Sequence, residues 1–303
     1  MKLFLTFLSL ITVANISRAA LFTNSVSADT FVRANAPAAN YGAAGALTVS
    51  GSTATNASGT VNGVADTFIR FNTSALVTSL NSTFGPNNWI INGVILRVVE
   101  MGAPNNNIFT RGKGIFEIRW TSNDSWTEGT GMPMTPTTDG IAYNDEPPLL
   151  TNTVSLGIFT NAAANISDLF SLALPAALTS DISAGTDVSL YLTAAGTDIG
   201  FTFNSQNFTM ANQRPVLIIS ATPPPSVAAI TLSGANAVIW GTNNLAGGAT
   251  NVVLSSTNAF APLNQWTPIA TNIMLGAGSF SIPVATPDNT GASPQQFFIL
   301  QTK

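Results

Sequence analysis

The stretch Val188-Ser189-Leu190-Tyr191-Leu192-Thr193 decides the fold class of this chain. Its aliphatic residues occupy every second position. Because successive side chains of a β-strand point to opposite faces of a sheet, this pattern places the aliphatic residues on one face. Gly200-Phe201-Thr202-Phe203-Asn204 repeats the pattern with two phenylalanines. We therefore expect strands in a sheet that has one face on a hydrophobic core and the other face in water.

Similar runs, separated by Gly, Asn, Pro and Ser clusters, predict an all-β fold for the rest of the chain. Up to residue 221 the expected strands are 28–33, 65–72, 93–101, 114–121, 187–193, 200–204 and 215–220. The continuously apolar run Val216–Ile219 indicates a strand covered on both faces, or one near a domain junction. Ile166–Ile182 has leucines near helical spacing, interrupted by Pro175, and predicts a short helix over one end of a sandwich.

The clearest domain boundary is Thr222-Pro223-Pro224-Pro225-Ser226. Consecutive prolines cannot extend a β-ladder and favour polyproline II, a semi-rigid spacer. Beyond this boundary we expect short strands at 228–232, 237–240, 251–255, 266–270, 279–284 and 296–300. Their number and length predict a small immunoglobulin-like or fibronectin-like sandwich at 226–303, joined by the linker 223–225 to a first domain at 20–222. The alternative is one domain that continues through the prolines.

The N-terminal residues 1–19 have the features of a secretion signal. Lys2 gives a positive charge, and the apolar run Leu3–Ala14 is too short to cross a bilayer. Ser17 and Ala19 are small residues at the positions that a signal peptidase requires. We therefore expect a secreted or cell-surface protein with no membrane insertion after signal cleavage.

The composition removes several classes of chemistry. The chain has no Cys and no His in 303 residues, and only 8% of its residues are charged. A Ser-His-Asp triad is therefore excluded, and a zinc site is disfavoured. The formal net charge is −4 and the basic residues are scattered, so we expect no nucleic-acid partner.

Motifs spread over residues 28–221 resemble the DNRLRE-type domain, a secreted bacterial jelly-roll sandwich grouped with carbohydrate-binding modules. The matching segments, in chain order, are Ala28–Arg33, Asn40–Gly42, Leu47–Val49, Thr67–Asn72, Ile91–Val98, Trp126–Gly129, Gly140–Asn144 and Asn212–Leu217. The resemblance implies a jelly-roll-like β-sandwich that binds carbohydrate. The segment after the prolines is similar to C-terminal modules of many secreted bacterial proteins.

Carbohydrate binding needs aromatic rings for the C–H faces of a sugar and polar groups for its hydroxyls. The region from Trp120 to Glu146 offers both and is rich in Gly, Pro and Thr, as a surface loop would be. The candidate ligand-binding residues are Trp120, Trp126, Glu128, Tyr143, Asn144 and Asp145. The alternative is that Trp126 and Glu128 only anchor a long loop.

No cofactor is certain from the sequence. Calcium needs only oxygen ligands, and related jelly-roll modules often hold a structural calcium ion. The carboxylates that could contribute are Asp29, Asp66, Asp139, Asp145 and Glu146. They show no known calcium-binding spacing, so the sequence leaves the metal site unknown.

Three classes of function stay open at this point. We expect a non-catalytic protein that recognises a polysaccharide or a cell-surface glycan. The second class is a structural or adhesive surface protein without a specific glycan ligand. The third is a hydrolase or lyase that works with carboxylates such as Asp124, Glu128, Asp145 and Glu146.

Overall fold

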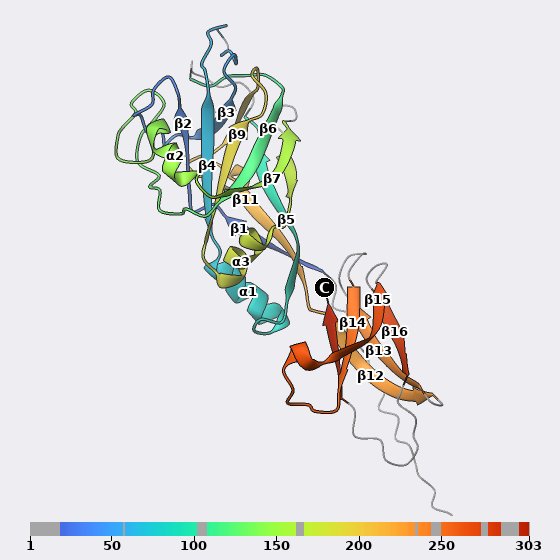
Figure 1. The fold of residues 1–303 in the computed structure, drawn as a ribbon. Helices are drawn as coiled ribbons and strands as arrows, with labels where there is room; N and C mark the ends of the chain where they lie inside the picture. The colour runs from blue at the N-terminus through green and yellow to red at the C-terminus, as the bar shows by residue number, and fades with distance from the viewer. Residues whose placement is uncertain are drawn as a thin grey trace, which may run out of the picture. The chain divides into compact units, whose positions relative to one another are not determined.

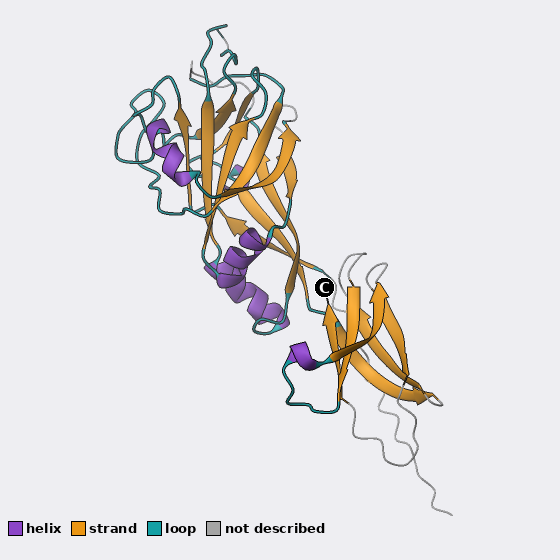
Figure 2. Cartoon of the chain, viewed as in Figure 1, coloured by secondary structure: helices purple, strands orange, loops and turns teal. Residues whose placement is uncertain are grey.

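The computed structural model describes residues 19–56, 58–101, 108–161, 167–233, 236–243, 250–273, 278–285 and 297–302. All of the expected signal peptide except Ala19 therefore lies outside the described residues. The chain divides into two compact units. One contains Ala20–Asn87 and Ile91–Ala221, and the other contains Thr222–Lys303. Strands dominate both units, which confirms the predicted all-β class (Figure 2).

The first unit is built from two β-sheets. The smaller sheet has the strand order β1 (Ala20–Ser25), β11 (Val216–Thr222), β5 (Ile90–Val99) and β8 (Ser167–Leu172). The larger sheet has the order β10 (Gly200–Asn204), β3 (Ala46–Ser50), β4 (Ala65–Asn72), β9 (Asp187–Ala194), β6 (Ile115–Thr121) and β7 (Thr153–Thr160). Strand β2 (Ala28–Arg33) also pairs with β4 (Figure 1). All pairings in the larger sheet are antiparallel.

Phenylalanines join the two sheets of this unit into a sandwich. The ring centroid of Phe116 on β6 lies 5.2 Å from that of Phe170 on β8 and 4.9 Å from that of Phe201 on β10. Phe203 lies 4.9 Å beyond Phe201, so the predicted pairing of these two phenylalanines on one face is correct. Burial of such a ring stabilises the fold by about 1.5–3 kcal/mol. The core between the sheets therefore carries much of the stability of a chain without disulfides.

Helices cover the connections between strands. The longer ones are α1 (Ser74–Phe84), which the sequence pattern did not indicate, and α3 (Ala176–Ala184). The shorter ones are α2 (Glu146–Leu149) and the 3₁₀ turns η1 (Tyr143–Asp145), η2 (Ala211–Gln213) and η3 (Leu263–Gln265). No helix among the described residues is long and apolar enough to span a bilayer.

Two local expectations were met only in part. The expected helical segment 166–182 contains the strand β8, in which Asp168, Phe170 and Leu172 alternate with exposed residues. Helix α3 begins only after Pro175, because a proline at the boundary has a fixed φ and no N–H for a helix interior. The apolar run 216–219 is covered mainly on one face, since Leu217 and Ile219 are fully buried and their neighbours are half-buried. Of the two alternatives for this run, the position near a domain junction is correct, because the first unit ends at Ala221.

Strand β9 is buried on both faces, whereas the sequence pattern predicts one face in water. Its aliphatic residues face the core as predicted, but the intervening Ser189 and Tyr191 are also buried, with 0% and 7% of their surface exposed. The outer face of the sheet is therefore not in water at this point. The connection from β6 to β7 covers it.

The second unit contains two three-stranded sheets. The first comprises β12 (Ser226–Ser233), β13 (Asn236–Asn243) and β16 (Gly278–Ala285), and the second comprises β15 (Thr267–Ile273), β14 (Thr250–Ser256) and β17 (Phe297–Thr302). Ile239, Val253 and Phe280 belong to a core that both sheets share. Each of the expected strands in this region corresponds to one of these six strands, although residue 296 lies outside the described residues.

Candidate functional site

The connection between β6 and β7 is folded onto the outer face of the larger sheet. Its residues Trp126, Ile141 and Leu149 pack in one hydrophobic cluster with Phe68 of β4 and Tyr191 of β9. We call this set, together with Ala28 and Val32 of β2, the outer cluster. The outer cluster holds the connection against the sheet. It therefore fixes the positions of the residues next to Trp126, Ile141 and Leu149.

Trp126 is the central anchor of this connection. Only 5% of it is exposed, and its indole N–H donates to Ser189 Oγ at 3.0 Å. The Arg70 guanidinium lies 4.7 Å from the ring centroid of Trp126 and donates to the Trp126 carbonyl at 2.9 Å. A tryptophan whose N–H is paired and whose ring packs on Phe68 is held in one orientation.

Asn40 ties the connection to the rest of the unit. Its Nδ2 donates to the carbonyls of Glu128 at 2.7 Å and Ile141 at 2.9 Å. Its Oδ1 accepts from the backbone N–H groups of Gly42 at 3.0 Å and Gly131 at 3.2 Å. A Cβ on Gly131 would lie 1.9 Å from the Asn40 carbonyl, so only glycine fits beside it. This buried side chain therefore joins the two ends of the connection, near Glu128 and Ile141, to each other. We call this place the base of the connection.

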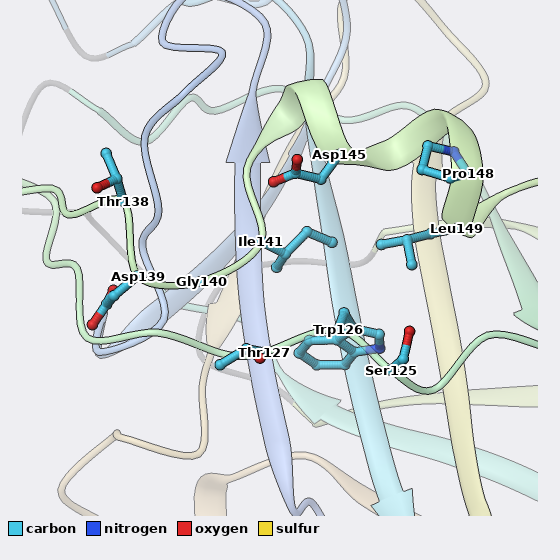
Figure 3. A pocket seen from close by; sticks show the side chains of 10 residues that line it. All are labelled: Ser125, Trp126, Thr127, Thr138, Asp139, Gly140, Ile141, Asp145, Pro148 and Leu149. Atoms are coloured by element: carbon cyan, nitrogen blue, oxygen red, sulfur yellow. The ribbon is translucent and has the colours of Figure 1, made fainter.

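An open pocket of about 380 Å³ lies between the two limbs of the connection (Figure 3). Trp126, Ile141 and Leu149 give it an apolar floor. The other lining residues are Ser125, Thr127, Thr138, Asp139, Gly140, Asp145 and Pro148. The pocket thus combines an apolar base with hydroxyl and carboxylate groups at its edge. Pockets of this size and composition are typical of small-molecule sites.

Two carboxylates stand at the edge of this pocket. Asp139 Oδ1 accepts from Thr130 N at 3.0 Å and Thr137 Oγ1 at 2.5 Å, and Asp139 Oδ2 accepts from Thr130 Oγ1 at 2.7 Å. The bonds from Thr137 and Thr130 lower the pKa of Asp139 to about 2, so it is ionised at all ordinary pH values. Asp145 Oδ2 accepts from the Ala142 N–H at 2.9 Å.

A second acidic pair lies beneath the connection. Asp66 of β4 and Glu146 of α2 are 2% and 7% exposed, and their side chains are hydrogen-bonded to each other. Burial, and then the charge of Asp66, raise the pKa of Glu146 to about 9. Burial also raises the pKa of Asp66 to about 6, against hydrogen bonds from Thr193 and Tyr191. The pair therefore holds one proton near neutral pH, and it fixes α2 to the sheet.

Glu128 has a different environment from the pocket. It is half-buried, and its carboxylate accepts from the side chains of Gln206 and Asn207. Asp29 lies close by, fully buried, with Oδ2 accepting from the Gln206 N–H at 2.6 Å. Burial raises the pKa of both carboxyl groups. These contacts connect the start of the connection to the segment after β10.

The structure brings together only some of the sequence-predicted site residues. Trp126 and Asp145 line the pocket, Tyr143 packs half-buried against the outer cluster, and Asn144 is exposed next to it on η1. Glu128 is held at the base of the connection. Trp120 lies elsewhere: it faces the interior of the sandwich from β6, and its indole N–H donates to Asp181 Oδ2 at 2.8 Å. We therefore leave Trp120 out of the site.

Sequence reasoning missed the residues that shape the pocket. Ile141 and Leu149 form its floor, and Asn40 holds its base, but none of them was a candidate. The available signals were the glycines at 129, 131 and 140, which crowd around Asn40. A glycine in a long connection can mark a place where another part of the chain comes close to the backbone. Here that part is Asn40.

The carboxylates considered for calcium do not gather in one place. Asp66 and Glu146 meet, whereas Asp29 and Asp139 have separate partners. Calcium requires six to eight oxygen ligands as a rule. Within the described ranges there is no group of three or more Asp, Glu, His or Cys residues that could hold a metal ion. We therefore assign no calcium site.

The family model for carbohydrate-binding module family 96 matches residues 20–221, which include the whole sandwich and its pocket. The chain belongs to carbohydrate-binding module family 96. This membership confirms the expected class of function, carbohydrate binding, for the first unit of the family 96 protein. Carbohydrate-binding modules are, as a class, non-catalytic binding modules.

The chain also has a distant likeness to solved structures of β-glucuronidases. A β-glucuronidase from Ruminococcus gnavus has 8% identity and a TM-score of 0.25, over 93% of this chain and 41% of that chain. A β-glucuronidase from Lactobacillus rhamnosus has 11% identity and a TM-score of 0.22, over 92% of this chain and 44% of that chain. The chain thus spans less than half the length of these enzymes. The search of curated proteins found no match.

Proposed function

We propose that the pocket over Trp126 is the glycan-binding site of this family 96 protein. The observation that carries the proposal is the composition of the pocket: an apolar floor of Trp126, Ile141 and Leu149 beneath exposed hydroxyl and carboxylate groups. A sugar ring has apolar C–H faces and a rim of hydroxyls, so both parts of the pocket have a counterpart in the ligand.

Preorganisation supports the same site. The pocket lies on a connection, where binding sites are common, but this connection is held by the outer cluster and by the hydrogen bonds of Asn40. Because the connection is already ordered, little conformational entropy is lost when a ligand binds. We propose that the protein binds a segment of polysaccharide here with little change of shape.

We further propose binding without catalysis. Glycoside hydrolysis needs two carboxyl groups about 5–10 Å apart on either side of the scissile bond. Asp66 and Glu146, the carboxyl pair with the most strongly raised pKa values near the pocket, are in contact with each other and buried under α2. That arrangement supports a structural role for the pair.

We further propose where the protein acts and what its two units are related to, on the basis of sequence features. The N-terminal 19 residues support secretion to the outside or the surface of a bacterial cell. The motifs over 28–221 support a relationship to DNRLRE-type domains, and the two small sheets of the second unit support an immunoglobulin-like or fibronectin-like module.

Thr127→Trp tests the site. Thr127 is exposed and lines the pocket, so a bulky ring there should fill the pocket without entering the core. We expect at least about 10-fold weaker binding to any polysaccharide that the wild type retains, with an unchanged melting temperature. The measurement is affinity electrophoresis in gels that contain one polysaccharide each.

Thr135→Trp is the matched control for this variant. Thr135 is exposed on the same connection but is not among the pocket residues. It should bind as the wild type does. Equal retention of the Thr127→Trp variant and the wild type would show that the glycan binds elsewhere.

A further inference from the structure

We propose that Trp240 in the second unit is a separate contact for carbohydrate, and that it takes uncharged polysaccharides with flat, extended chains, such as insoluble β-1,4-linked glucans. This contact is independent of the pocket over Trp126, because it lies in a different unit and on a different kind of surface. Three features of the second unit support it: the exposure of one ring, the small residues around that ring, and the lack of charge in the described residues.

Trp240 stands on the outer face of the sheet formed by β12, β13 and β16 (Figure 1). Its neighbours Ile239 and Gly241 on β13 are buried, whereas Trp240 is 45% exposed. Its indole N–H donates to Oγ1 of Thr231, on the neighbouring strand β12, at 2.9 Å. Because the ring reaches toward the next strand and about half of it stays exposed, it lies along the sheet with one face toward solvent. The hydrogen bond fixes its orientation, so little side-chain entropy is lost when a sugar stacks on it.

The residues around Trp240 are small, and most carry a hydroxyl group. In the register of the sheet, Ala229 of β12 and Ser281 of β16 stand directly opposite Trp240, one on each side. The other residues of this face are Val238 and Thr242 on β13, Ser226 and Thr231 on β12, and Ser279 and Pro283 on β16. All are smaller than a leucine, so none can cover the indole. A flat ligand can therefore reach the ring, with hydroxyl groups around it for the ligand's own hydroxyls.

The lack of charge narrows the class of partner. The described residues between Thr222 and Thr302 include no Asp, Glu, Lys or Arg. Nucleic acids and anionic lipid surfaces are bound through cations, and the described part of this unit offers none. A stable interface with a second protein buries about 800 Å² on each partner around an apolar centre, whereas this face has one indole among small, mostly polar residues. Stacking of a sugar ring on one indole, with hydrogen bonds to hydroxyls, needs neither charge nor a large apolar area.

The flatness of the face favours flat, extended chains. β-1,4-linked glucans and related uncharged polysaccharides expose the faces of their sugar rings along a ribbon, and a ribbon can lie on a sheet without entering a cleft. Together with the pocket of the first unit, the chain then has two contacts for polysaccharide. Two linked contacts bind a polymer more tightly than either contact alone, even when each is weak.

The test is a depletion assay of the full chain on three insoluble, uncharged β-1,4-linked polysaccharides: amorphous cellulose, mannan and chitin. Insoluble material is used because it presents the flat ribbons that this face fits, whereas the pocket is tested with polysaccharides dissolved in gels. Thr127→Trp is the background, because it blocks the proposed pocket and leaves the second unit unchanged. We expect the background to be retained on at least one of the three, and Trp240→Ala in this background to weaken retention about 10-fold. Trp240→Tyr, which keeps a ring, should recover most of the retention.

Phe260→Ala is the matched control. Phe260 is another exposed ring of the second unit, 96% exposed, but it lies on the connection between β14 and β15, in the other sheet. This variant should be retained as the background is, and all variants should keep the melting temperature, since neither ring belongs to the core of the unit. Unchanged retention of Trp240→Ala, an equal loss for Phe260→Ala, or no retention of the background on any of the three polysaccharides would overturn the inference. None of these outcomes bears on the pocket, whose own test compares Thr127→Trp with the wild type.

Discussion

Replacing Asn40 with alanine is expected to lower the free energy of unfolding by about 3–4 kcal/mol and to abolish glycan binding. The reason is the number of buried partners that one side chain satisfies. Asn40 is fully buried and makes four hydrogen bonds to backbone groups of Gly42, Glu128, Gly131 and Ile141. Each buried group left without a partner costs about 1–3 kcal/mol, although water entering the space would recover part of this.

The loss should be localised to the connection between β6 and β7. Hydrogen–deuterium exchange should show faster exchange in Asn123–Thr151, with β4 and β9 still protected. Urea unfolding gives the change in stability. Glycan binding should disappear because the floor residue Ile141 and the segment after Glu128 lose their common anchor.

Two variants make the Asn40 result specific. Asn40→Asp keeps the acceptor for Gly42 and Gly131 but sets a buried carboxylate oxygen against the carbonyls of Glu128 and Ile141, so we expect a loss at neutral pH at least as large as that for alanine. Asn207→Ala is the matched control: Asn207 is exposed, and its side chain donates to the Gly42 carbonyl at 2.9 Å in the same region. It should cost less than about 1 kcal/mol. A loss for Asn40→Ala no larger than for this control would contradict the role given to Asn40.

The fold class could be predicted from the sequence because strand periodicity is local. In β9 the aliphatic residues recur every second position, and in β10 both phenylalanines share a face, as the structure confirms. Helix α1 was missed because its hydrophobic contribution is small: of its eleven residues, Leu76 and Leu80 are the buried ones. The segment before Pro175 was misread because leucines at spacings of two and three fit both a strand and a helix.

The candidate site was predicted only in outline. Trp126 and Asp145 do line the pocket, but Trp126 is a buried anchor and not an exposed platform. Sequence could not show this, because burial of Trp126 depends on Phe68 and Tyr191, which stand on strands far away in the chain. The intervening positions of β9 looked solvent-facing by pattern, and only the tertiary fold shows that a connection covers them.

The protein should lose stability as the pH rises, by about 3 kcal/mol or more between about pH 5 and pH 9, and Glu146→Gln should remove most of this loss. The pKa of Glu146 is raised in the folded state, by burial first and by the charge of Asp66 second, to about 9. Above the usual carboxyl pKa, about 4.3, the unfolded chain therefore binds fewer protons than the folded chain. The derivative of the unfolding free energy with pH is then negative, so stability is fully present below the usual pKa and is lost as the pH approaches 9.

Glutamine at position 146 keeps an N–H donor for Asp66 and cannot ionise, so the variant should exceed the wild type in melting temperature at alkaline pH and resemble it near pH 5. In the wild type, deprotonation places two charges against each other beneath α2, and the described contacts of this pair include the hydroxyls of Tyr191 and Thr193 but no cation. Release of α2 would move the pocket residues Asp145 and Leu149, so glycan affinity should fall over the same pH range.

Glu117→Gln, which removes a carboxylate paired with Arg119 at 3.0 Å on the same sheet, is the control and should keep the wild-type pH profile. Parallel pH profiles for the wild type and Glu146→Gln would mean that the pair is not what holds this connection to the sheet.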